Sequence, residues 1–123
     1  MTLHRLKPIE VTDEDLTREI ERLVRDVAQL FGNELIKVIQ FGSSLGGAVA
    51  MHQYSDVDLC VVLEPSASHK SYFGQLPISK LVPVDWILVH KDEFEEKANK
   101  RHGVFHLVNS DGRIVWDRSY GKI

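Results

Sequence analysis

An apolar strand with two acids on one face constrains this chain more than any other feature of its sequence. The segment from Asp56 to Leu63 alternates so that Asp56 and Asp58 project to the same side. Two neighbouring carboxylates on a hydrophobic strand repel each other and lose hydration, which costs free energy unless a cation compensates. Mg²⁺ meets this need because it prefers one or two carboxylates together with substrate phosphates. The strand therefore predicts a metal-dependent site for a phosphate-bearing substrate.

A third acid, Asp85, interrupts a second apolar strand predicted from Pro83 to Val89. Taken alone, such a carboxylate could pair with an arginine or a helix N-terminus, and Asp56 could simply cap the turn before its strand. If the two strands are neighbours, however, three carboxylates at one end can hold two Mg²⁺ ions about 3.5–4 Å apart. Such a pair of ions suits an in-line displacement at phosphorus.

A Gly-Ser-Ser turn precedes the acids and adds a second element of the predicted site. Gly42, Ser43 and Ser44 follow a strand predicted from Leu35 to Phe41, and a short helix is predicted from Ser43 to about His52. Glycine allows close approach of the backbone to a ligand, and N–H groups that open a helix bind phosphate oxygens. Alone, this turn is more often a plain helix cap. Together with acids on two strands, it indicates a nucleotide site.

The remaining segments alternate between helical and extended patterns. An amphipathic helix begins at Thr12, with acids in its first turn, and ends at Gly32. Its apolar stripe consists of Leu16, Ile20, Leu23, Val27 and Leu30. A later helix begins at Asp92 and can extend past Gly103 to about Val108, before a short strand from Arg113 to Trp116.

These elements predict a single α+β domain over residues 1–123, because the connections are too short to separate domains. We expect a small mixed sheet of about four strands with helices packed on it. The net charge of −3 argues against extensive nucleic-acid binding, which normally leaves a basic excess. The single cysteine, Cys60, excludes an internal disulfide. No signal peptide or membrane-spanning run is visible in the sequence, so a cytoplasmic location is expected.

The order strand, Gly-Ser, helix, Asp-x-Asp strand and Asp strand resembles the minimal nucleotidyltransferases of the DNA polymerase β superfamily. The resemblance covers roughly Leu35 to Val89, and the segment from Asp92 to Asp117 also resembles the usual ending of that family. It implies the polymerase-β-type nucleotidyltransferase fold. It also implies site residues, with nucleotide binding by Gly42, Ser43 and Ser44 and catalytic metal binding by Asp56, Asp58 and Asp85.

The same resemblance implies an activity and a partner. Members of the family transfer a nucleoside monophosphate, usually from ATP, to a hydroxyl or phosphate acceptor, with two Mg²⁺ ions and with pyrophosphate as the leaving group. Small members are often encoded beside an all-helical HEPN protein as the antitoxin of a toxin–antitoxin pair. Some of them modify a tyrosine of that partner with AMP. A HEPN-type partner is therefore expected, and a homo-oligomer is compatible with this expectation.

Two features favour an alternative, in which the chain binds nucleotide with little or no catalysis and neutralises a partner by covering it. The stretch after Gly42 is longer and more apolar than is common in the family, and no Lys or Arg lies between Lys37 and Lys70. The three acids favour the enzyme, because a non-catalytic domain has no evident need for them. The connection from Glu64 to Leu81 either carries a short helix or forms a mobile flap. Its Tyr72, Phe73 and Leu76 are the predicted contact surface for a partner.

Overall fold

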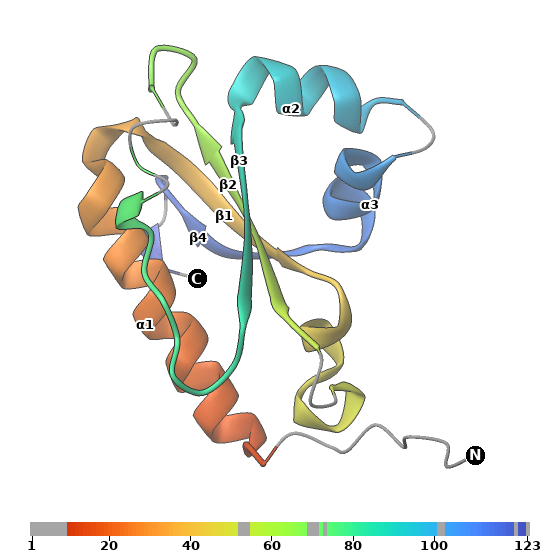
Figure 1. The fold of residues 1–123 in the computed structure, drawn as a ribbon. Helices are drawn as coiled ribbons and strands as arrows, with labels where there is room; N and C mark the ends of the chain where they lie inside the picture. Colours follow the sequence, from red (N-terminus) through yellow and green to blue (C-terminus); the bar gives the residue numbers. More distant parts are fainter. Residues whose placement is uncertain are drawn as a thin grey trace.

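The computed structural model contains a five-stranded mixed sheet with helices on both faces (Figure 1). It describes residues 10–51, 55–68, 72, 74–100, 103–119 and 121–122. The strands are β1 (Leu35–Phe41), β2 (Val57–Leu63), β3 (Val84–His90), β4 (Arg113–Asp117) and β5 (Gly121–Lys122). The helices are α1 (Asp13–Phe31), α2 (Lys91–Ala98) and α3 (Val104–Asp111), with short 3₁₀ turns η1 (Gly32–Glu34), η2 (Ser43–Gly46) and η3 (Ala48–Ala50). The predicted α+β fold class is confirmed, and the two-residue β5 adds an edge to the four predicted strands.

The strand order β3-β2-β1-β4-β5 brings the acid-bearing strands together. β2 runs parallel to β3 and antiparallel to β1, so the starts of β2 and β3 meet the end of β1 at one end of the sheet. Within this register Asp58 lies beside Asp85 on one side and beside Phe41 on the other. The acids of the two strands therefore lie at the same end of the sheet.

Helix α1 covers one face of the sheet, as its apolar stripe predicts (Figure 1). The hydroxyl of Thr12 accepts a hydrogen bond from the Asp15 amide at 3.1 Å, and Gly32 ends the helix with φ 56°. Leu23 and Val27 are fully buried against apolar side chains of β1 and β2. None of the helices in the described part of the chain has the length and apolar character needed to cross a membrane.

Helices α2 and α3 cover part of the opposite face, and they correct the prediction of one long helix from Asp92 to Val108. α2 ends at Ala98, and α3 begins directly after Gly103, whose φ of 102° is incompatible with a continuing helix. α2 also begins one residue earlier than predicted, and Asp92 lies inside its first turn. The break lets the two short helices fold back on each other, with Phe94 and Phe105 in edge-to-face contact at 5.9 Å between ring centroids.

The helix predicted from Ser43 to His52 is also wrong, because two 3₁₀ turns, η2 and η3, replace its described part. Gly42 and Gly47 adopt φ values of 78° and 76°, so each resets the backbone direction before a turn. The end of the predicted helix, His52, lies outside the described residues. We refer to residues 42–50 as the Gly-Ser loop.

The connection after β2 is fastened to α1 by packing and hydrogen bonds. Tyr72 packs on Phe31 with ring centroids 4.6 Å apart, and Leu76 packs against the core on the α1 face. The Ser79 hydroxyl donates to Glu19 Oε2 at 2.7 Å. The expectation that these side chains have little to pack against is therefore wrong for Tyr72 and Leu76, and Phe73 lies outside the described residues. Contact with a partner stays a prediction.

Candidate active site

Three carboxylates converge where the starts of β2 and β3 meet. Asp56 lies just before β2, Asp58 is in β2, and Asp85 is its register partner in β3. One oxygen from each of the three side chains lies within 4.8 Å of the others. Asp58 projects from the same face of β2 as Cys60, which packs in the core with α2 and α3. Because α2 begins directly after β3, the carboxylates lie at the opposite end of that strand (Figure 1).

The electrostatics of this cluster favour a bound cation. Burial, followed by repulsion from Asp85 and Asp56, raises the pKa of Asp58 to about 6. Among the residues that the structure describes, none of the three carboxylates forms an ion pair. Three close carboxylate oxygens without a protein cation match the ligands that Mg²⁺ prefers, so the residues fit a divalent metal. Asp56 and Asp85 are exposed and accessible to such an ion.

Position 42 requires a glycine for two reasons: it lies against the Asp58 carboxylate, and its backbone has a positive φ. A Cβ atom at this position would overlap Oδ2 of Asp58, far inside van der Waals contact. The backbone at the end of β1 therefore passes directly over the Asp58 carboxylate. This contact with Asp58 is a second reason for the glycine, beside the approach to a ligand that the sequence alone suggests.

The two serines of the loop lie in different environments. Ser43 is exposed next to Gly42, whereas Ser44 is buried with only 2% of its surface exposed. The Ser44 hydroxyl accepts a hydrogen bond from Gln40 Nε2 at 2.9 Å. The structure therefore leaves the Ser43 side chain open to a ligand and commits the Ser44 side chain to the protein interior.

Sequence reasoning missed a residue that holds the far end of the loop. Oδ1 of Asp13 accepts a hydrogen bond from the Ala48 amide at 2.6 Å. A Cβ on Gly47 would lie 2.7 Å from the same oxygen, so a glycine is needed beside it. An acid at position 13 is also favoured by the helix dipole at the start of α1, so its presence needs no other explanation. Nothing in the sequence indicates its contact with Ala48, 35 residues away.

Comparison with known proteins identifies the family. The family model for the nucleotidyltransferase domain matches residues 20–109, which include all three acids and the Gly-Ser loop. The chain therefore belongs to this family of nucleotidyltransferase domains, within the polymerase-β-type superfamily.

A solved structure supports the fold independently. The crystal structure of a candidate nucleotidyltransferase from Sulfolobus solfataricus superimposes with a TM-score of 0.61. The two chains are 21% identical, and the match covers 90% of this chain and 88% of the other. No curated protein sequence is significantly similar to this chain. The superfamily part of the resemblance is thus confirmed, and the HEPN pairing stays a prediction.

The raised pKa of Asp58 predicts how the stability of the metal-free protein depends on pH. Between about pH 4 and pH 6 the folded chain keeps a proton on Asp58 that the unfolded chain releases, so stability falls as pH rises. We expect a loss of about 1–2 kcal/mol, allowing for solvent screening of a half-exposed group. Urea unfolding in EDTA at several pH values measures this loss of stability, with the Asp58→Asn variant as the reference. A constant difference between the two proteins from pH 4 to pH 7 would contradict the assigned electrostatics.

Proposed function

We propose that this chain is a Mg²⁺-dependent nucleotidyltransferase that transfers AMP from ATP to a hydroxyl group. The observation that carries the proposal is the cluster of Asp56, Asp58 and Asp85, which has no protein cation among the described residues. Membership of the nucleotidyltransferase-domain family supplies the reaction class. The choice of Mg²⁺ follows from the all-oxygen ligands, and the choice of ATP follows from the resemblance to minimal nucleotidyltransferases.

In this proposal the three acids have different roles. Asp56 and Asp58 would hold both metal ions, and Asp85 would hold the ion nearer the acceptor. Bound Mg²⁺ would supply neutralisation of the triphosphate charge and a lower pKa for the acceptor hydroxyl. Asp85 lies on the edge strand β3 and is exposed, so it is well placed to help take the proton of an incoming hydroxyl. The acceptor oxygen bonds to the α-phosphorus while the bond to pyrophosphate breaks.

The Gly-Ser loop would bind the triphosphate beside the acids. Gly42 brings the backbone against Asp58, and the neighbouring Ser43 hydroxyl is exposed at the same place. Catalysis at such a site consists mainly of positioning and of stabilising charge on the transferring phosphoryl group.

The acceptor that we propose is a hydroxyl on a HEPN-type protein partner. Support for this proposal comes from the resemblance to the small antitoxin members of the family, some of which modify a tyrosine of their partner. Co-expression with the protein encoded by the adjacent gene, followed by mass spectrometry, tests it. A partner carrying an added AMP supports the proposal, and an unmodified partner co-purified with an active chain contradicts it.

A second candidate function, a binding module with little catalysis, is favoured by two features in and around the loop. No Lys or Arg lies between Lys37 and Lys70 to meet phosphate charge. The loop also contains 3₁₀ turns, so it lacks the dipole of a full α-helix. Under this reading the protein binds Mg²⁺ and ATP but shows no AMP transfer to any partner with which it forms a complex.

ATP binding is expected to require a divalent cation, because the triphosphate and the three carboxylates otherwise repel each other. Isothermal titration calorimetry of ATP in Mg²⁺ and in EDTA measures this dependence. Asp92→Asn is a matched control, since it removes an exposed acid on α2 at the other end of β3. Equal affinity for ATP with and without Mg²⁺ would contradict the metal-bridged site.

A further inference from the structure

A chain of hydrogen bonds reaches the Gly-Ser loop from the face of the sheet opposite the acids. Gln40 of β1 pairs with Leu59 and projects toward α1, whereas the next residue, Phe41, pairs with Asp58 and projects to the other face. Gln40 is fully buried, which is unusual for an amide in a small domain. A buried polar side chain is costly unless its hydrogen bonds are made, so its partners are informative.

The partners of Gln40 define the orientation of its amide. Arg113 Nη2 donates to Gln40 Oε1 at 2.8 Å, and Gln40 Nε2 donates to Ser44 Oγ at 2.9 Å. A guanidinium has donors only, so the amide oxygen must face Arg113 and the amide nitrogen must face Ser44. Arg113 thus determines which group of Gln40 is offered to the loop. Among the described residues, Arg113 forms no ion pair that would compete for its guanidinium.

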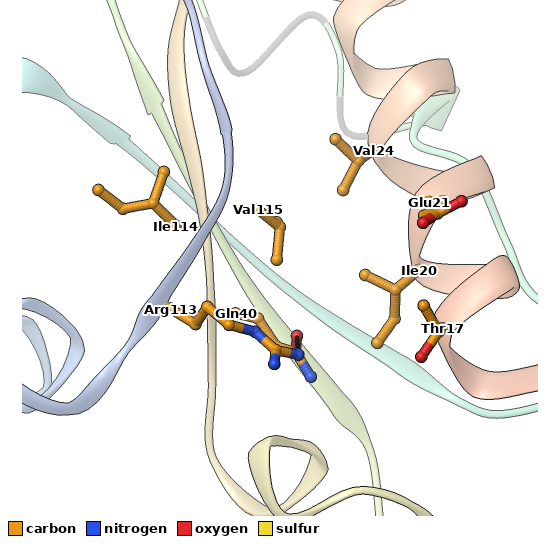
Figure 2. Close-up of a pocket in the computed structure, with 8 residues that line it drawn as sticks. All are labelled: Thr17, Ile20, Glu21, Val24, Gln40, Arg113, Ile114 and Val115. Carbon is orange, nitrogen blue, oxygen red and sulfur yellow. Dashed lines mark hydrogen bonds between the residues drawn. The ribbon is translucent and has the colours of Figure 1, made fainter. Parts of the chain in front are cut away.

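We refer to the hydrogen-bonded series of Arg113, Gln40 and Ser44 as the relay. A cavity of about 310 Å³ between α1 and β4 lies beside it (Figure 2). Ile20 and Val24 of α1 and Val115 of β4 form its apolar walls, and Gln40 and Arg113 lie together at one side. Gln40 itself is fully buried, and its hydrogen bonds to Arg113 and Ser44 satisfy both polar atoms of its amide.

The relay ends two residues from the glycine that covers Asp58. Fixing Ser44 restricts Ser43 and Gly42, and Gly42 lies so close to Asp58 that a Cβ there would overlap Oδ2 of the carboxylate. Asp13 holds the far end of the same loop through the Ala48 amide. The loop is thus held at both ends by contacts that leave its exposed Ser43 free.

We propose that Gln40 and Arg113 are positioning residues that set the nucleotide affinity of the Gly-Ser loop through Ser44. This inference rests on the proposed function. It adds that residues on the α1 face of the sheet, opposite the acids, control nucleotide binding. Neither residue touches the three acids. Loss of Gln40 should therefore raise the KM for ATP about tenfold, with a change in kcat of about threefold or less.

A double-mutant cycle tests the connection between Gln40 and Ser44. Gln40→Leu and Ser44→Ala should each raise the KM, and the double variant should be no worse than either single one. Gln40→Glu should largely restore the wild-type KM, because the Ser44 hydroxyl can rotate and donate to the carboxylate while Arg113 pairs with it. Additive effects of the two single substitutions would mean that Ser44 binds nucleotide directly, which would overturn the proposal.

Arg113→Met keeps the test valid if Gln40→Leu fails to fold, because Arg113 is exposed. We expect this variant to raise the KM about threefold. Arg118→Met is the matched control, since Arg118 follows the same strand but contacts Glu64 and Asn33 instead. Equal KM values for the two arginine variants would remove Arg113 from the positioning role.

Hydrogen exchange of the amides in residues 43–47 separates this proposal from the proposed function, because it needs no nucleotide. Faster exchange in Gln40→Leu and Arg113→Met, but not in Arg118→Met, is expected. Unchanged exchange in both relay variants would overturn the positioning role even if the enzyme is active. A wild-type chain that neither binds nor transfers a nucleotide would instead reject the proposed function, and the exchange rates would still decide whether the relay holds the loop.

Discussion

Replacement of Asp58 by Asn is expected to abolish nucleotidyl transfer while leaving the fold intact. Asp58 is the central carboxylate of the cluster, with Asp85 as its register partner and Asp56 two residues before it on the same strand face. Loss of a metal ligand removes several kcal/mol of charge stabilisation in the transition state, which corresponds to a decrease in rate of about 10³-fold or more. Transfer of radiolabelled AMP to a co-purified partner measures the effect.

Thermal unfolding of the same variant provides the control for folding. In EDTA at pH 7, Asp58→Asn should be as stable as the wild type or more stable, because the substitution removes a carboxylate that burial and two neighbouring acids disfavour. Undiminished AMP transfer by a well-folded variant would exclude Asp58 from catalysis. A large decrease in stability would instead show that the carboxylate has a structural partner.

Gly42→Ala is the second substitution with a large expected effect. The new methyl group would overlap Oδ2 of Asp58, and the φ of 78° is unfavourable for any residue with a Cβ. We expect a destabilisation of about 2–4 kcal/mol from the combined clash and strain, together with loss of metal-dependent ATP binding. Urea unfolding and calorimetry with Mg²⁺ and ATP measure the two effects.

Gly32→Ala is the matched control for backbone strain. Gly32 also has a positive φ, of 56°, but nothing lies within 4 Å of a Cβ placed there. This variant should lose about 1 kcal/mol of stability and keep wild-type ATP binding. Equal effects of the two substitutions would show that the contact between Gly42 and Asp58 has no functional importance.

The site acids could be located from the sequence because strand periodicity determines the direction of neighbouring side chains. Asp56 and Asp58 are two residues apart, so a strand predicted from Asp56 to Leu63, one residue longer than β2, is enough to place them together. The bounds of β1 were predicted correctly, since Leu35 to Phe41 is a compact apolar segment next to a glycine. To place Asp85 in the same cluster, it is enough that a second apolar strand lies beside the first.

The Gly-Ser loop could not be predicted, because contacts between distant segments determine its conformation. Local patterns predict a helix from Ser43 to about His52, although Gly47 inside this segment has backbone angles that interrupt one. The hydrogen bond between Gln40 and Arg113 joins residues 73 apart in the sequence. Propensity and periodicity describe neighbours along the chain and contain no information on such a pair.

The exposure of the connection after β2 could not be predicted from the sequence either. Polar and proline-containing composition suggested exposure, yet Tyr72 packs on Phe31 and Leu76 joins the core. The network of Ser79, Glu19 and Arg22 that fastens the segment to α1 combines ordinary surface residue types. Only the fold shows that they meet.

Diffraction from crystals grown with Mn²⁺ and a non-hydrolysable ATP analogue tests whether the three acids bind the metal ions beside the nucleotide, because Mn²⁺ gives an anomalous signal and accepts the ligands of Mg²⁺. We expect anomalous peaks among the carboxylates of Asp56, Asp58 and Asp85, with the triphosphate against Gly42 and Ser43. Nucleotide bound elsewhere, for example in the cavity beside Gln40 and Arg113, with no Mn²⁺ at the three acids, would contradict it.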